Sequence, residues 1–119
     1  MNTVEHLPTA TIGSARIDRR TPSQFDCMRE AIHGRRLSPR PITMLFVNGN
    51  LMMSDGDDEL RSNAEFCIRA NGRVLIAGLG LGLILHNLPD AVTHVTVVEK
   101  NPDIISLVGP YYISDRIEI

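Results

Sequence analysis

The chain has 119 residues, of which 43% are hydrophobic and 22% charged, and its formal net charge is -2. This length and composition suit one globular domain with a hydrophobic core, and they argue against two domains. The basic residues are scattered and offset by acids, so no electrostatic footprint for nucleic acid is visible.

The sequence contains no recognisable targeting segment or membrane span. Residues 1–18 lack a basic flank followed by a continuous apolar core, and the apolar run from Val74 to Leu85 is interrupted by glycines and is too short for a bilayer. Cys27 and Cys67 have no second Cys or His at ligand spacing, so we interpret both as small buried hydrophobes in a reducing compartment. We predict no metal site and a cytoplasmic location.

Residues 1–41 are predicted to form an N-terminal segment with one helix. The stretch TATIGSARID alternates as a strand does, and in TPSQFDCMREAIHG Thr21 is a candidate N-cap, Pro22 suits the first helical position and Gly34 follows the helix. One apolar face at helical spacing should pack against another part of the protein; its residues are Phe25, Met28, Ala31 and Ile32.

The stretch ITMLFVNGNLMMSD, which begins at Ile42, predicts a β-hairpin. Asn48 and Gly49 tolerate the positive φ values of a tight type I′ turn. The following stretch SDGDDELRSNAEFCIRANG starts with acids suited to a helix N-terminus and ends at a candidate C-cap, Asn71-Gly72. The apolar stripe of this helix consists of Leu60, Ala64, Cys67 and Ile68.

From Arg73 onward the pattern is typical of alternating strands and helices. RVLIAGL is apolar at successive residues, as in a strand covered on both faces, and THVTVVEKN repeats this theme. GLGLILHNLPD between them predicts a crossover helix closed by Pro89, whereas Asn101 and Pro102 can start another helix before a third strand in RIEI. The predicted class is therefore α/β, with a Rossmann-like parallel sheet preceded by a hairpin and helix within residues 42–119.

A glycine-rich turn after the first of these strands predicts a ligand site. Gly78, Gly80 and Gly82 allow positive φ values and let a nucleotide-like ligand approach the backbone. Glu99 follows the next strand and is placed to accept hydrogen bonds from both ribose hydroxyls of an adenosine. Glycines and acid together predict a two-point clamp for an adenosine-bearing ligand.

The residues around this turn favour a ligand without phosphate. Leu83 stands where the dinucleotide fingerprint G-x-G-x-x-G/A has its last small residue, so G-x-G-x-G fits better. No Lys or Arg lies between Gly78 and Glu99, and the sequence has no G-K-[ST] motif for a triphosphate. The candidate ligand that remains is S-adenosylmethionine or a related compound.

The motifs RVLIAGLGLGLIL and VTHVTVVEKNPDIISLV resemble those of class I S-adenosylmethionine-dependent methyltransferases, in particular the spermidine-synthase-like branch. The resemblance runs from Ile42 to Ile119, and Ile76 is apolar as in spermidine synthases. It implies S-adenosylmethionine, S-adenosylhomocysteine or decarboxylated S-adenosylmethionine as cofactor and Glu99 as its ribose ligand. The residues expected to bind the cofactor are Gly78, Leu79, Gly80, Gly82, Glu99, Lys100 and Asn101.

The chain also departs from the pattern of this branch. Met52 stands approximately where spermidine synthases have a nucleoside-binding Gln, and Ser62 and Asn63 replace the Tyr and His of the D-E-x-x-Y-H-E run. The catalytic Asp and the adenine-binding acid of the family follow strands three and four, whereas this sequence stops in strand three. We therefore name no catalytic residue, and transferase activity with a methyl or aminopropyl acceptor stays open.

The resemblance to the first half of a domain predicts self-association. In the family the first strand is central, so VLIAGL would here become an apolar edge, and pairing with a second copy would bury it. We expect a homodimer or a higher oligomer. The alternatives to a short S-adenosylmethionine-binding protein are a fragment of a longer enzyme, a non-catalytic remnant that folds by oligomerisation, and part of an NAD-binding oxidoreductase.

Overall fold

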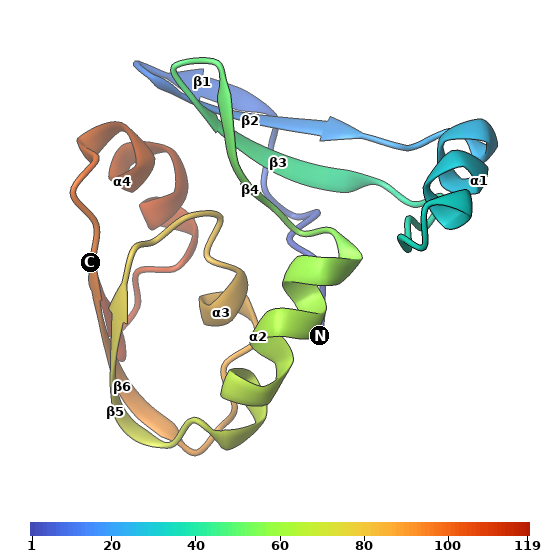
Figure 1. Cartoon of the computed structure of the whole chain (residues 1–119). Helices are drawn as coiled ribbons and strands as arrows, with labels where there is room; N and C mark the ends of the chain where they lie inside the picture. Colours follow the sequence, from blue (N-terminus) through green and yellow to red (C-terminus); the bar gives the residue numbers. More distant parts are fainter.

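The computed structural model describes residues 1–119, which form two β-sheets and the helices that accompany them (Figure 1). One hydrophobic core contains residues of both sheets. The antiparallel sheet contains, in spatial order, β1 (Ala10–Ile12), β2 (Ala15–Arg20), β3 (Ile42–Val47) and β4 (Asn50–Ser54). The parallel sheet contains β5 (Gly72–Ala77), β6 (Val92–Val98) and β7 (Ile117–Glu118). The helices are α1 (Gln24–Ile32), α2 (Asp57–Arg69), α3 (Leu83–His86) and α4 (Pro102–Val108), which the 3-10 helix η1 (Gly109–Tyr111) follows. The predicted α/β class is confirmed.

The antiparallel sheet joins the N-terminal segment to the predicted hairpin. β3 and β4 are connected by Asn48 and Gly49 with φ values of 51° and 77°, which confirms the predicted tight turn. The single strand expected in TATIGSARID is instead a second hairpin, β1 and β2, because Gly13 takes a φ of 54° and reverses the chain. β2 then pairs with β3 along its whole length. One sheet therefore contains strands from both sides of residue 41, where the predicted N-terminal segment ends.

Helix α1 begins later than predicted, and the chain leaves its apolar face exposed. Its N-cap is Ser23, which forms a capping box with Asp26, and not Thr21. None of its residues is buried, and Phe25, Met28 and Ile32 are 71%, 65% and 81% exposed. Figure 1 shows α1 projecting beyond the ends of β2 and β3, so the predicted docking of its apolar face is wrong within this chain.

Helix α2 ends at Arg69 with Ala70 as its C-cap, one residue before the predicted C-cap, and Gly72 with a φ of 66° already begins β5. Cys67 is buried, as predicted, but Ile68 is 79% exposed. Successive helical residues differ by about 100° in direction, so Ile68 faces away from the side that Cys67 buries. The predicted apolar stripe therefore contributes only in part to the core.

The parallel sheet is covered on one face only. On that face Val95, Val97 and Ile117 pack with residues of α3 and α4 in a single core cluster. The opposite face leaves Leu75 and Val98 71% and 60% exposed, so the prediction that β5 is covered on both faces is wrong. The physical reason is that both connecting helices contribute their buried residues to the same side.

The connection from β5 to β6 contains less helix than predicted. α3 is a single turn that ends at His86, well before Pro89. The side-chain amide of Asn87 donates to the Leu83 carbonyl at 2.8 Å and to the Asn2 carbonyl at 2.9 Å. These bonds close the helix early and attach it to the N-terminal residues. By contrast, α4 begins as predicted, with Asn101 as N-cap and Pro102 as its first residue.

Two carboxylates connect parts of the chain that lie far apart in the sequence. Asp55 is fully buried, and its carboxylate oxygens accept hydrogen bonds from the Val4 N–H at 3.0 Å and the Thr43 N–H at 2.8 Å. Asp103 of α4 accepts both the N–H and the hydroxyl of Ser14 at 2.8 Å. These hydrogen bonds hold the pKa of Asp103 below its ordinary value and fix the β1–β2 turn on α4.

None of the helices combines the length and the apolar character that crossing a bilayer requires.

Replacing Asp55 should strongly destabilise the fold. The Asp55→Ala variant leaves the buried N–H groups of Val4 and Thr43 without acceptors, and each such loss costs about 1–3 kcal/mol. We expect urea unfolding to show a free energy lower by about 2–5 kcal/mol. Asp58→Ala removes an exposed carboxylate of α2 and should change it by less than about 0.5 kcal/mol. Equal effects of the two substitutions would contradict this role of Asp55.

Candidate functional site

The chain reverses direction directly after β5 through three glycines in left-handed conformation. Gly78, Gly80 and Gly82 have φ values of 93°, 54° and 70°, and α3 begins at the next residue, Leu83. Other L-residues adopt this conformation only with strain of about 1–2 kcal/mol. The glycine turn, residues 78–82, therefore forms because glycine stands at each of its strained positions.

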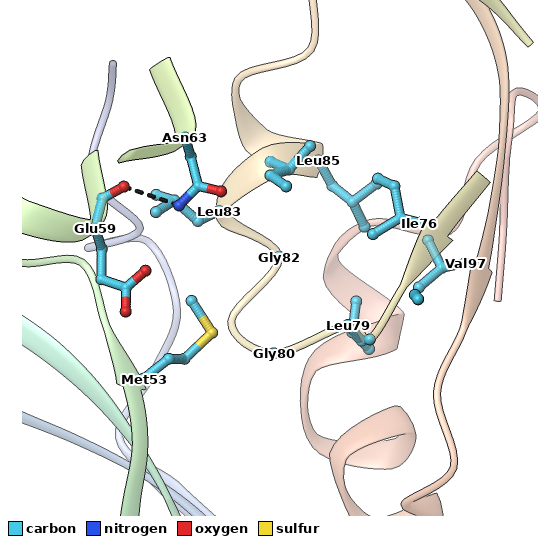
Figure 2. A pocket seen from close by; sticks show the side chains of 13 residues that line it. Met53, Glu59, Asn63, Ile76, Leu79, Gly80, Gly82, Leu83, Leu85 and Val97 are labelled. Carbon is cyan, nitrogen blue, oxygen red and sulfur yellow. Dashed lines mark hydrogen bonds between the residues drawn. The ribbon is translucent and has the colours of Figure 1, made fainter. Parts of the chain in front are cut away.

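A cavity of about 280 Å³ lies between the glycine turn and helix α2 (Figure 2). Eight of its 13 lining residues are hydrophobic. The lining residues are Met53, Glu59, Asn63, Ile76, Ala77, Gly78, Leu79, Gly80, Gly82, Leu83, Ile84, Leu85 and Val97. Figure 2 shows Ile76, Val97 and Leu85 on one side of the turn. Met53, Glu59, Asn63 and Leu83 lie on the other side.

The polar part of the cavity wall offers acceptors. Glu59 is the only charged residue in the lining, and no Lys or Arg reaches it. The amide nitrogen of Asn63 donates to the Glu59 carbonyl at 2.8 Å, which leaves the amide oxygen of Asn63 without an intramolecular donor. A ligand that is neutral or cationic and brings its own donors fits this wall better than an anion.

Side chains of the protein itself occupy the space beside two of the three glycines. A Cβ at Gly80 would collide with the Met53 sulfur, and one at Gly82 would collide with the Tyr112 ring. A Cβ at Gly78 would meet nothing within 4 Å. Packing within the chain thus explains the glycines at 80 and 82, and the open space that a ligand could use lies at Gly78.

Met53 and Tyr112 also hold the turn by its polar backbone. The Leu81 N–H donates to the Met53 sulfur at 3.1 Å, and the Tyr112 hydroxyl donates to the Leu81 carbonyl at 2.9 Å. Burial raises the pKa of Tyr112, which keeps its hydroxyl protonated as a donor. The Gly80 N–H has no acceptor within the chain and stays free for a ligand or water.

Histidines on the other side of Tyr112 complete this support. The rings of His6 and His86 stack at 4.4 Å between centroids, and His6 meets Tyr112 edge-on at 5.7 Å. Burial and the nearby His86 and Arg19 lower the pKa of His6. The N-terminal segment, α3 and the residue that follows η1 are therefore packed together beside the glycine turn.

Glu99 binds the protein backbone instead of facing the cavity. Its Oε2 accepts the Leu79 N–H at 2.9 Å, and its Oε1 accepts the Asn101 N–H at 2.9 Å. The carboxylate thereby ties the glycine turn to the end of β6. Each oxygen keeps a further lone pair, which is the capacity that the predicted ribose contact would use.

The structure divides the seven predicted cofactor-binding residues into two groups. Those of the glycine turn line the cavity, and those that follow β6 do not. In the second group Lys100 is exposed, whereas Asn101 caps α4 by accepting the Asp103 N–H at 2.9 Å. The glycine turn and Glu99 are joined by the Leu79–Glu99 hydrogen bond, but only the turn lines the cavity, so the two-point clamp stays a prediction.

Sequence reasoning missed the residues that approach the glycine turn from elsewhere. Met52 stands at the position of the nucleoside-binding Gln in the resemblance, but it is 59% exposed, and its neighbour Met53 contacts the turn instead. Tyr112 gave no signal beyond its position near the chain end. Asn63 was noted only as a departure from a motif, although its helical spacing of four from Glu59 places both on the same face of α2.

Comparison of the chain with protein-family models, curated proteins and solved structures finds no match to any of them. The side chains of the structure form no group of three or more His, Cys, Asp or Glu that could hold a metal ion.

A methyl group at Gly82 should cost more stability than one at Gly34. Both glycines have nearly the same φ, 70° and 72°, but only Gly82 lies against a side chain, whereas Gly34 has open space. We expect Gly34→Ala to lose about 1–2 kcal/mol from backbone strain, and Gly82→Ala to lose a further 1–3 kcal/mol, approximately, from overpacking against Tyr112. Chemical denaturation measures both, and equal losses would show that the Tyr112 contact does not constrain the turn.

Proposed function

We propose that this chain is a Rossmann-like domain that binds S-adenosylmethionine or a closely related adenosine compound at the glycine turn. The observation that carries the proposal is a cavity that opens on Gly78 and Gly80 and contains one carboxylate and no cationic side chain. The order of strand, glycine turn, helix, strand and acid supports it further, as does the parallel pairing of β5 with β6.

The size of the cavity favours a nucleoside over a dinucleotide. Small-molecule sites usually measure about 300–1,000 Å³, and this cavity of about 280 Å³ lies at the lower end. The charge of the lining points the same way, because it contains no Lys or Arg that could neutralise a phosphate group. An NAD-binding oxidoreductase, the third of the possible functions, is therefore disfavoured.

The residues present fit the parts of such a ligand. The apolar walls from Ile76, Leu83 and Leu85 suit an adenine ring or a thioether chain, and the Glu59 carboxylate suits a sulfonium or ammonium group. In this proposal Glu99 receives the ribose hydroxyls through the lone pairs that Leu79 and Asn101 leave free.

If the domain takes part in a transfer reaction, the ligand supplies an electrophilic carbon bound to its sulfonium sulfur. A substrate nucleophile would attack that carbon and the thioether would leave. The contribution of this chain would be to bind and orient the ligand and to exclude water with its apolar wall. We assign no general base.

A non-catalytic role is the second candidate, and it has its own observation. Met53 and Tyr112 fill the space beside Gly80 and Gly82, as expected for a turn whose shape is determined by packing alone. In that case the cavity would bind none of the nucleosides named above. We place either role in a reducing, cytoplasmic setting because both cysteines are free.

Calorimetric titration of the full chain tests the proposal. We expect S-adenosylmethionine or S-adenosylhomocysteine, or the decarboxylated cofactor, to bind and NAD not to bind. Asn63→Trp should fill the cavity and abolish binding, whereas Ser62→Trp, at an exposed neighbouring position outside the lining, should leave it unchanged. Absence of binding by any of the three sulfur compounds would support the non-catalytic role, and binding of NAD alone would reverse the choice of ligand.

Glu99→Ala should weaken binding of the same ligand. Loss of charge-assisted hydrogen bonds to the ribose corresponds to about 1–3 kcal/mol of binding free energy. Glu118→Ala is the matched control, because Glu118 belongs to the same sheet but bonds to Thr96 and His94 on its exposed face. Both variants are first compared by thermal unfolding. Unchanged affinity in a folded Glu99→Ala variant would exclude Glu99 as the ribose ligand.

A further inference from the structure

β5 is the longest edge strand in the molecule. It extends over six residues, whereas the other sheet edges, β1, β4 and β7, have three, five and two. Native proteins protect such edges with charges, prolines or bulges. β5 has no proline, its only charge is Arg73, and its only irregularity lies between Gly72 and Arg73 at its start. Residues 73–77 therefore present a regular, unprotected row of backbone donors and acceptors.

The side chains beside this edge are apolar and unpartnered. Leu75 is 71% exposed and Ala77 is also exposed, and both lie on the face of the sheet that no helix covers. Val98 on the neighbouring strand β6 is 60% exposed on that same face, opposite Ala77 in the register. Parallel sheets in α/β proteins are normally covered on both faces, so this arrangement favours association.

We propose that two copies of the chain pair through β5, antiparallel to each other and related by a two-fold axis at Leu75. Two identical strands related by a two-fold axis can only run antiparallel, and the pair would join the two parallel sheets into one sheet of six strands. The contact is isologous, so it closes after two copies.

The sequence of β5 favours this register over its neighbours. Centring on Leu75 places each leucine beside the partner's Leu75 and pairs all five residues of the regular segment 73–77. Arg73 then lies opposite the partner's Ala77, and the two arginines stay apart. A register centred on Arg73 would instead oppose like charges and leave Leu75 unpaired.

The same features favour a second copy over a different partner, because antiparallel self-pairing sets apolar side chains beside each other and keeps the two Arg73 side chains apart. Five paired residues at about 3.4 Å each make a contact about 17 Å long. Such a length belongs with small, reversible interfaces, so we expect dissociation constants in the micromolar range, on the order of 10–100 μM.

Sedimentation equilibrium of the full chain, at roughly 5–500 μM to bracket that range, tests the proposal. The mass should rise from 13.2 kDa toward twice that value. Leu75→Lys should weaken association at least tenfold, because it puts two lysines side by side at the axis. Leu51→Lys changes an exposed leucine on β4, the edge strand of the other sheet, so it should leave association unchanged.

Disulfide cross-linking tests the proposed pairing of two β5 strands even if Leu75→Lys fails to fold. The Leu75→Cys variant should form an intermolecular disulfide under mild oxidation, since opposite residues of an antiparallel pair lie within bonding distance. The wild type, with half-buried Cys27 and buried Cys67, is the control and should not. A wild-type monomer at the highest concentration, equal loss of association in both lysine variants, or no cross-link at Leu75→Cys would each overturn the proposal.

Discussion

The rest of the structure depends on the contacts by which Met53 and Tyr112 hold the glycine turn. Met53 comes from the antiparallel sheet and Tyr112 from the end of the chain, and both bind Leu81 between the glycines. The turn can pass between them because Gly80 and Gly82 have no side chains. One short segment thus connects the two sheets, starts α3 and forms a wall of the cavity.

The N-terminal residues near these contacts are packed into the core of the fold. Val4 and Leu7 are fully buried in the core cluster that also contains residues of both sheets. Asp55 holds Val4 against β3 by hydrogen bonds, and Asn87 holds Asn2 against α3. Residues that looked like an irregular lead-in to the sequence therefore stabilise the side of the domain that supports the glycine turn.

The sequence predicted those features that local chemistry determines. Asn48-Gly49 specifies a hairpin turn, and Asn101-Pro102 specifies a helix start, because their backbone preferences act over a few residues. It did not predict contacts between distant segments, such as Met53 with the turn, since no pattern encodes which side chain arrives there. Likewise, periodicity identified the apolar face of α1 but could not say that nothing in the chain covers it.

For the candidate site, too, the sequence predicted the local turn but not the contacts between distant residues. The glycines line the cavity as expected, but Glu99 binds the backbone, because a carboxylate beside free N–H groups accepts their hydrogen bonds whether or not a ligand is bound.

The most direct measurement of the central claim, that the glycine turn binds S-adenosylmethionine, is a nitrogen–proton correlation spectrum during titration with that compound. The account predicts shifts at the amides of Gly78, Gly80 and Gly82 and none at Gly34 or Gly49. A spectrum that stays unchanged, or shifts only at glycines outside the turn, would contradict it.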